Sequence, residues 1–371
     1  MSRSWIALCL IVLVACAPRG TMVLDPAAAA IGTVEKVFVG TTRKREADGV
    51  FSGGRSEQVA FARYDVSIPP DRAAGEINAP RRNATPNPRT QFLTTSAEIY
   101  DTTPEFQADL RRQLAASGGE AVIFVHGYNT TFPESIYRVA QFAHDLKLPG
   151  TVVLYSWASS GRPLGYAYDR DSALVARDGL ERLIHEVSRA GAKRILLVAH
   201  SMGSGLTMEA LRSIDLRGDK RALAVLGGVI LISPDIDVDV FREEALSIGT
   251  LPQPFVIFGS DRDKALRLSA ALTGQQERLG SLSDVSRLAD LKVTFLDVSA
   301  FSKGTGHFVV GDSAVLIALL DRIVDIQGAF ERDQQSRVGL LPALVLTVQS
   351  ATQIILRPIG AVAEGVQGVF Q

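Results

Sequence analysis

The sequence predicts an α/β fold: a mostly parallel, doubly wound sheet with helices on both faces, preceded by a β-rich N-terminal extension. From residue 120 onward, short runs of wholly apolar residues alternate with amphipathic segments of helical length, which is the pattern of consecutive βαβ units. Strands that are apolar on both faces belong inside a parallel sheet that helices cover. The composition agrees, because 46% hydrophobic and 21% charged residues are typical of a chain with a packed core.

The first residues predict a signal peptide, because the apolar run 5–14 follows a basic residue and is too short to span a bilayer. The run Leu-Val-Ala-Cys that ends at Cys16 resembles the lipobox of bacterial lipoproteins. This resemblance implies cleavage before Cys16 and attachment of fatty acyl chains such as palmitate. Since Ala17 rather than Asp follows, it also implies a lipid-anchored protein of the bacterial cell envelope, in the outer membrane and facing the periplasm. An ordinary signal peptide with an incidental Cys16 is the alternative.

Charge and cysteine content exclude several classes of function. Lys plus Arg (39) balances Asp plus Glu (40), so no net charge would attract nucleic acid. Both cysteines, Cys9 and Cys16, lie at the N-terminus, so no disulfide framework can form in the folded body. The five histidines lack H-E-x-x-H spacing and no Walker-type loop occurs, so we expect neither a metal nor a cofactor.

Composition and periodicity divide the chain into five segments. They are a signal peptide (1–15), a lipidated tether rich in Ala and Pro (16–34), a β-rich extension (35–115), the α/β catalytic domain (116–330) and an apolar tail (331–371). The strands expected in the extension are Glu35–Thr42, Gln58–Ile68 and Gln91–Ile99.

Within the α/β domain, the apolar runs predict strands and the amphipathic segments predict helices. The expected strands are Ala121–Val125, Thr151–Tyr155, Arg194–Ala199, Gly227–Ile232, Pro254–Phe258 and Val293–Val298. The expected helices are Pro133–Leu146, Asp171–Arg189, Gly203–Ser213, Lys264–Leu272 and Ser313–Ile326. In the tail, apolar residues recur at helical spacing, at Leu341, Leu344, Val345, Val348 and Ile355. We expect this face to pack on the domain, with a membrane interface as the alternative.

Residues 195–205 run from a buried strand through a turn of small residues into a helix. Ala199, Ser201 and Gly203 fit the G-x-S-x-G pattern of a nucleophile elbow, with Ala in place of the first Gly. The positions two residues before and two residues after the serine must be small, because the strained turn brings the neighbouring backbone close to them. Ser201 is therefore the predicted nucleophile, and an ordinary βα turn is the alternative.

A serine hydroxyl needs an imidazole within hydrogen-bond reach to take its proton. His307 follows the last predicted strand and lies in a glycine-rich loop, which suits a general base. His200 precedes the nucleophile and should point away from it, whereas His144 and His185 lie in amphipathic helices. His126 ends the first strand of the domain, directly before the turn that must supply an oxyanion donor.

The third group should orient His307 and lie between the serine and the histidine in the chain. Two strand ends offer carboxylates. We prefer Asp263, because its strand directly precedes the one that leads to His307, and Asp235 is the alternative acid. Asp261 and Asp237 are expected to cap helices or to pair with arginines.

An acyl-transfer site also needs two donors for the developing oxyanion, and losing one costs about 2.7–4 kcal/mol. The main-chain N–H groups of Tyr128, in the His-Gly turn, and of Met202, after the nucleophile, are the candidates. Only 18 residues separate Asp235 from Pro254, which leaves no room for a lid domain. The aromatic residues that could form an apolar substrate wall are Tyr128, Trp157, Tyr166, Tyr168 and Phe301, with core packing as the alternative for Trp157 and Phe301.

These motifs resemble the α/β-hydrolases and, more narrowly, the bacterial α/β-hydrolase family of unknown function numbered 900. The segments that carry the resemblance are Phe124–Asn129, Tyr155–Trp157, Ala199–Gly203, Pro234–Asp237 and Asp263–Leu266. The resemblance covers about residues 36–330 and implies an α/β-hydrolase fold with Ser201, Asp263 and His307 as the triad. Members often carry Trp-Pro-Ser where this chain has Trp157-Ala158-Ser159, so the wall beside the site differs there.

We therefore expect a serine hydrolase, of esterase or thioesterase type, whose substrate is a small-molecule or lipid ester. Its expected partner is the membrane, through the lipid on Cys16. An acyltransferase is one alternative. A catalytically silent lipoprotein that uses the fold as a binding scaffold is the other.

Overall fold

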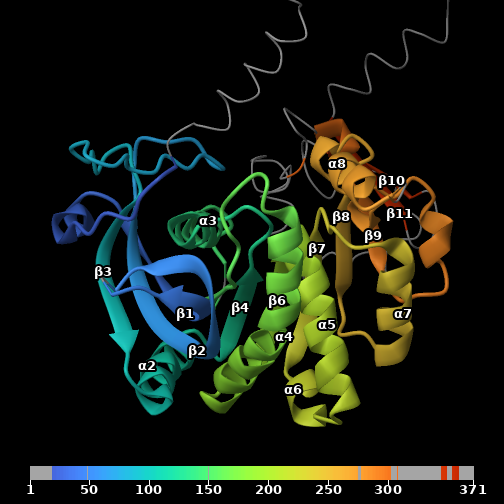
Figure 1. Cartoon of the computed structure of the whole chain (residues 1–371), viewed down its shortest axis with the longest axis horizontal. Helices are drawn as coiled ribbons and strands as arrows, with labels where there is room; N and C mark the ends of the chain where they lie inside the picture. Colours follow the sequence, from blue (N-terminus) through green and yellow to red (C-terminus); the bar gives the residue numbers. More distant parts are fainter. Residues whose placement is uncertain are drawn as a thin grey trace, which may run out of the picture.

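The computed structural model describes residues 19–47, 49–148, 150–274, 277–301, 307, 344–348 and 353–358. One 11-stranded sheet has the strand order β10-β11-β9-β8-β7-β6-β4-β5-β1-β2-β3 (Figure 1). The strands are β1 (Thr33–Arg45), β2 (Phe51–Ile68), β3 (Leu93–Tyr100), β4 (Glu120–Val125), β5 (Thr151–Ser156), β6 (Arg194–His200), β7 (Leu226–Ile232), β8 (Phe255–Gly259), β9 (Thr294–Asp297), β10 (Leu344–Val348) and β11 (Gln353–Pro358). The helices are α2 (Thr103–Ala116), α3 (Phe132–Asp145), α4 (Tyr166–Arg189), α5 (Met202–Leu216), α6 (Lys220–Ala224), α7 (Val238–Ile248) and α8 (Lys264–Leu272).

The centre of the sheet is parallel, and its strands are buried on both faces. β5, β4, β6, β7, β8 and β9 pair in parallel with their neighbours. Along β4, Ile123 and Val125 pack into one hydrophobic cluster, and Val122 and Phe124 pack into the other. This alternation follows from the two-residue period of a strand, and it explains why the strand sequences are apolar throughout.

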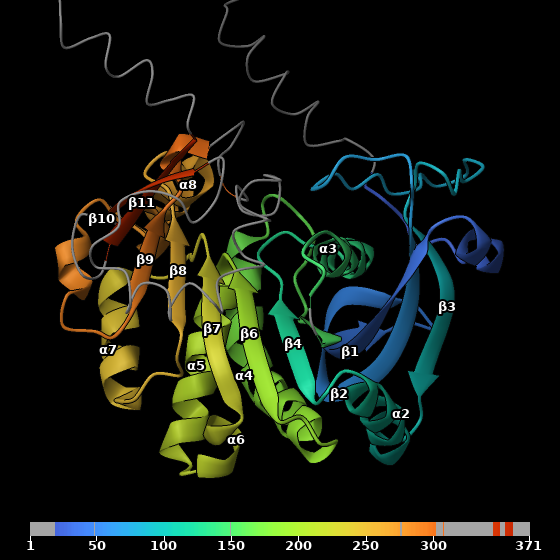
Figure 2. The same ribbon diagram turned by 180° about the vertical axis from the view of Figure 1, so that it is seen from behind.

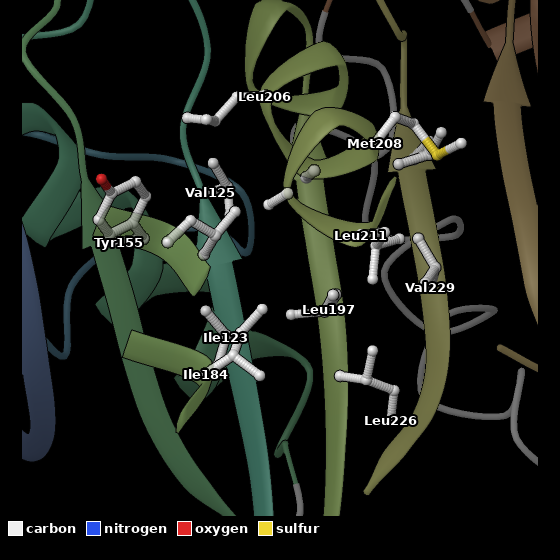
Figure 3. Close-up of a cluster of buried hydrophobic side chains, with 14 of the residues drawn as sticks. Ile123, Val125, Tyr155, Ile184, Leu197, Leu206, Met208, Leu211, Leu226 and Val229 are labelled. Carbon is white, nitrogen blue, oxygen red and sulfur yellow. The ribbon is translucent and has the colours of Figure 1, made fainter. Parts of the chain in front are cut away.

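Helices cover both faces of the sheet, as the sequence predicts. α2, α4, α5 and α7 supply apolar side chains to one cluster, and α3 supplies them to the other. Figure 1 shows α4 and α5 in front of the central strands, and Figure 2 shows the same strands from the opposite side. In Figure 3, Ile184 from α4 and Leu206, Met208 and Leu211 from α5 meet the side chains of β4, β6 and β7.

The strands expected in the α/β domain are confirmed, each to within one residue at either end. The expected helices do not include α2, α6 or α7, although Thr102 and Glu105 form a capping box with a proline in the first turn of α2 and Asp237 is among the expected helix caps. Helix α2 lies inside the segment expected to be β-rich. The helix expected at 313–326 lies outside the described residues.

The N-terminal strands extend the central sheet. β1 pairs in parallel with β5, and β2 and β3 follow it as antiparallel strands. Residues 19–34, assigned above to a tether, also belong to the folded body. Leu24 bridges to Thr94 on β3, and Ala28 in the short turn η1 (Pro26–Ala30) is fully buried. The tether expectation is therefore wrong for these residues.

The tail also differs from expectation, because its described part forms strands rather than a helix. β11 pairs in parallel with β9, and β10 pairs in antiparallel with β11. A short apolar run fits a strand as well as a helix, and the free edge of β9 offers main-chain partners that periodicity does not reveal. This part of the tail thus lies on the domain. Within the described residues, no helix combines the length and apolarity needed to cross a bilayer.

Candidate active site

Ser201 occupies the turn between β6 and α5, where the sequence places the nucleophile. Its backbone has φ 52° and ψ −125°, and positive φ at a non-glycine residue costs on the order of 1–3 kcal/mol. The turn is held from β7 and the loop after it, because Ser201 N donates to Ile232 O (3.0 Å) and Asp235 N donates to Ser201 O (3.2 Å). A Cβ at Gly203 would lie 2.3 Å from His126 O, so only glycine fits there.

His307 lies between the serine and an aspartate in the geometry of a catalytic triad. Its Nε2 is 2.9 Å from Ser201 Oγ, and its Nδ1 is 2.8 Å from Asp263 Oδ2. A carboxylate can only accept, so Asp263 holds the proton on Nδ1 and leaves the Nε2 lone pair facing the hydroxyl. In this tautomer the imidazole can take the serine proton.

Asp263 is fully buried at the start of α8, and its two oxygens have separate partners. Oδ1 accepts from the main-chain N–H groups of Ala265 and Leu266, both at 3.0 Å, and so caps the helix. Oδ2 is left for His307. The helix cap therefore fixes the carboxylate that orients the histidine.

Asp235, the alternative acid, has other partners. Its Oδ1 lies 3.1 Å from Arg278 Nε in a buried ion pair and accepts from Ser269 Oγ at 2.6 Å. Its Oδ2 accepts from Tyr166 Oη at 3.0 Å. The geometry thus favours Asp263 as the partner of the histidine. Asp237 caps α7, as expected.

The two proposed oxyanion donors flank the nucleophile. A Cβ at Gly127 would lie 2.8 Å from Ser201 Cβ, so the turn before Tyr128 packs directly on the serine. Met202 is the first residue of α5, where an N–H has no partner inside the helix. Within the described part of the chain, neither Tyr128 N nor Met202 N donates to a main-chain carbonyl outside the regular elements.

The turn His126-Gly127, which carries the proposed oxyanion donor Tyr128 N, is here called the oxyanion turn. A buried carboxylate that no sequence pattern predicted holds the loop after it. Asp169, fully buried on α4, accepts from Asn129 N at 3.1 Å, from Ser159 Oγ at 2.6 Å and from Ser160 N at 2.7 Å. Ser159 Oγ in turn accepts from Thr130 N at 3.0 Å. The loops after β4 and β5 are therefore tied together beside the nucleophile.

Arg43 on β1 is a second missed residue, and it lies buried beneath the same loops. Its guanidinium donates to Thr130 O (2.7 Å), Ser159 O (2.9 Å) and Ser156 Oγ (2.9 Å). Burial lowers the pKa of Arg43 to about 9, and the carboxylates of Asp169 and Glu134 oppose that shift. No sequence signal marks this residue, because a basic residue near a strand end is ordinarily solvated.

The remaining histidines have supporting or unrelated places. His200 packs its ring against that of His307, with 4.9 Å between centroids, so it lies beside the base. Burial, followed by the charge of His307, lowers the pKa of His200 well below its usual value, so its ring is neutral. His144 on α3 pairs with Glu35, and His185 on α4 lies near Glu181 and Asp219, so both histidines have partners other than Ser201.

The aromatic residues proposed as a substrate wall differ in burial, and a fully buried side chain cannot contact a substrate. Trp157 is fully buried, stacks on His126 with 5.0 Å between ring centroids and donates to His126 O at 2.7 Å. Its assignment to the substrate wall is therefore wrong, because it supports the oxyanion turn from within the core. Tyr128 and Tyr166 meet edge to face at 5.4 Å, and Phe301 is partly buried on the α3 side. Cys16 lies outside the described residues.

Comparison with protein families identifies the fold. A family model described as an alpha/beta hydrolase of unknown function (DUF900) matches residues 102–315, more than half of the chain. The chain belongs to this family. The match spans Tyr128, Ser201, Asp263 and His307, and the family description names no substrate. No match was found among curated proteins.

Solved α/β-hydrolase structures resemble this family member at low identity. Lipase B of Aspergillus fumigatus is 15% identical with a TM-score of 0.37, over 56% of this chain and 52% of the lipase. The chain thus spans about half the length of that enzyme. Esterases of Rhizomucor miehei are 13% identical with a TM-score of 0.37, over 82% of this chain and 88% of theirs. An enzyme from the metagenome of Lake Arreo, Spain, is 13% identical with a TM-score of 0.38, over 89% and 98%.

Proposed function

We propose that this α/β-hydrolase is a serine esterase or thioesterase, tethered to the bacterial cell envelope through lipid on Cys16. The contact chain Ser201 Oγ, His307 and Asp263 carries the proposal, with its two distances of 2.9 and 2.8 Å. A serine on a strained turn has no structural need for such partners, so their convergence indicates an activated nucleophile.

In the proposed reaction, His307 Nε2 takes the proton of Ser201 Oγ as the oxygen attacks the ester carbonyl. The N–H groups of Tyr128 and Met202 donate to the oxyanion of the tetrahedral intermediate. The intermediate collapses to an acyl-enzyme, and His307 gives its proton to the leaving alcohol or thiol. Water, deprotonated by His307, then releases the acid and restores the serine.

Asp263 orients His307 and stabilises the imidazolium that forms in each step. The N-terminus of α5 adds to the oxyanion site, because the partial positive charge at a helix start favours a negative charge beside Met202. The Ser201 hydroxyl lies 2.9 Å from Nε2 of its proposed base, so proton transfer needs little rearrangement.

A fluorophosphonate probe tests the proposal, because it reacts only with an activated serine. The chain from Ala17 onward is incubated with the probe and mapped by peptide mass spectrometry, and the Ser201→Ala variant serves as control. We expect modification of Ser201 alone and hydrolysis of p-nitrophenyl esters that falls about 10⁶-fold in the variant. Folded protein that neither labels nor turns over any ester would favour the binding-scaffold alternative.

A further inference from the structure

The first described residue, Arg19, is bound to the loop that carries the oxyanion turn. Arg19 Nη2 donates to Asn129 O at 2.7 Å, and Nη1 donates to Asn129 Oδ1 at 2.9 Å. Nε donates to Glu134 Oε1 at 2.8 Å, at the start of α3, and Nη1 also donates to Gly161 O. Asn129 directly follows Tyr128, so Arg19 lies against the loop beside the candidate active site.

The main chain after Arg19 is fixed as well. Thr21 N donates to Pro80 O at 3.0 Å, and Asp25 N donates to Thr94 O at 2.8 Å. Arg19 is therefore fixed to the folded body, and it cannot move far from the oxyanion loop without breaking these contacts.

Cys16, the expected lipid-bearing residue, precedes Arg19 by only three positions. Three residues reach about 11 Å at full extension. A free tether over 16–34 would instead have let the body move several tens of ångströms from the bilayer. The polar region of each leaflet is itself roughly 5–8 Å thick. A lipid on Cys16 would thus hold the oxyanion loop close to the membrane surface.

The loop between β5 and α4 adds an apolar contact at this edge. Leu164 is 99% exposed, and it lies three residues after Gly161, which accepts from Arg19. Tyr128 Oη donates to Pro163 O, so the loop that carries this exposed leucine is held beside Tyr128. Arg162 is also exposed on the loop and suits an anionic lipid head group.

We propose that the edge of the sheet bearing Ser201 faces the bilayer that holds the anchor, and that the substrate is an ester of a lipid in that leaflet. This inference rests on the proposed hydrolase function and on lipidation of Cys16. The ester groups of membrane lipids lie at the boundary of the hydrocarbon core, within reach of a site held this close. Leu164 enters this boundary, and the nucleophile meets its substrate without leaving the surface.

The orientation is testable without any turnover. Both cysteines lie within the first sixteen residues, so the body has no other thiol and accepts a single label cleanly. Leu164→Cys carries a fluorophore at the active-site edge. Leu216→Cys is the matched control, because it is 63% exposed at the other end of α5, about 22 Å from Ser201 along the helix.

The lipidated full-length protein is reconstituted into phosphatidylethanolamine–phosphatidylglycerol vesicles with a nitroxide on a fraction of the head groups. We expect the label at position 164 to be quenched at least fivefold more strongly than the label at position 216. Equal quenching of the two labels, or stronger quenching at 216, would overturn the orientation.

The substrate class is tested by lengthening the anchor. Twenty Gly/Ser residues inserted between Pro18 and Arg19 add roughly 25 Å of flexible reach and leave the contacts of Arg19 in place. We expect hydrolysis of a fluorogenic lipid ester in vesicles to fall about tenfold and hydrolysis of soluble p-nitrophenyl butyrate to stay unchanged. Leu164→Asp should have the same selective effect, and Leu216→Asp should have none.

The outcomes separate this inference from the function on which it rests. In one outcome, the protein cleaves the soluble ester, and neither the inserted linker nor Leu164→Asp changes its rate on the lipid ester in vesicles. This result would overturn the lipid substrate and leave the proposed hydrolase function unaffected. Cleavage of neither ester, together with no probe labelling, would overturn the hydrolase and the substrate class with it, while the quenching result would still decide the orientation.

Discussion

Arg43 Nη2 lies 3.3 Å from His126 Nε2, and this buried pair supports the oxyanion turn from below. His126 Nδ1 lies 2.8 Å from Gly127 O, and Nε2 also lies 3.1 Å from Trp157 O, so both ring nitrogens face main-chain carbonyls. Burial and the charge of Arg43 lower the pKa of His126 to about 3, which keeps its ring neutral. The turn that carries Tyr128 N–H is therefore held by a buried ring that stays neutral rather than by a titrating group.

Arg43→Lys should reduce kcat about tenfold with little change in KM, because the ammonium has three donors and cannot serve all the acceptors around Arg43. Each buried acceptor left unpaired also costs about 1–3 kcal/mol of stability. Steady-state kinetics on a soluble ester and urea unfolding measure the two effects. Arg55→Lys on β2 is the control, since Arg55 lies at the exposed surface over Tyr168 and should leave kcat unchanged.

Asp263→Asn should lower kcat by about 10⁴-fold, because an amide no longer enforces the required histidine tautomer. Asn caps helices nearly as well as Asp, so the free energy of unfolding should change by less than about 1 kcal/mol.

Asp235→Asn should instead lower the free energy of unfolding and leave kcat nearly unchanged. Removing its charge leaves Arg278 buried without a counter-ion, at a cost of about 3–5 kcal/mol, while kcat per folded molecule stays within about tenfold. The opposite pattern of kcat values would assign the acid to Asp235.

Gly203→Ala should destabilise the protein by at least about 3 kcal/mol or prevent folding, because the new Cβ would meet His126 O at 2.3 Å. Gly205→Ala, two residues further along α5, is the matched substitution. Its Cβ would have only an ordinary contact, 3.6 Å from Ile236 Cγ1, and alanine favours a helix by up to about 1 kcal/mol. Urea unfolding of the two variants should therefore give shifts of opposite sign, and equal losses would contradict the close approach at Gly203.

Glu244 on α7 should make the protein less stable as the pH rises from 5 to 8. Burial, followed by the nearby Glu209 carboxylate, raises the pKa of Glu244 to about 8 in the folded state, against an ordinary value near 4.5. Between these values the folded state keeps a proton that the unfolded state releases. The stabilisation is complete below about pH 4.5 and is lost towards pH 8, at up to roughly 1.4 kcal/mol per pH unit.

Glu244→Gln should flatten this part of the stability curve, which urea midpoints at pH 5 and pH 8 would measure. Glu243→Gln, at the exposed neighbouring position, should leave the difference between the two midpoints as it is in the unaltered protein. A Glu244→Gln variant that keeps the full difference would show that the buried carboxyl is not the titrating group.

Local sequence patterns were sufficient for the central elements and for the candidate nucleophile. Apolar runs bounded by turn residues predicted β4–β9, because a strand buried on both faces is apolar at nearly every position. The elbow at Ser201 was also predictable, because this turn requires small residues at fixed positions before and after the serine. His307 and Asp263 followed from chain order and from the rarity of histidine, and the two close contacts agree with that choice.

Tertiary structure alone decided the features that depend on residues far apart in the chain. Arg43 reaches loops more than eighty residues away, Trp157 packs beneath the oxyanion turn, and Arg19 reaches Asn129 across 110 positions. The tail became strands because β9 had a free edge. The spacing of apolar residues along an element indicates which of its faces is buried, but it does not indicate which distant segment covers that face. The sequence thus determined the fold class and the three candidate catalytic side chains, whereas the support of the oxyanion turn and the contact of Arg19 with the loop after it arose from long-range packing.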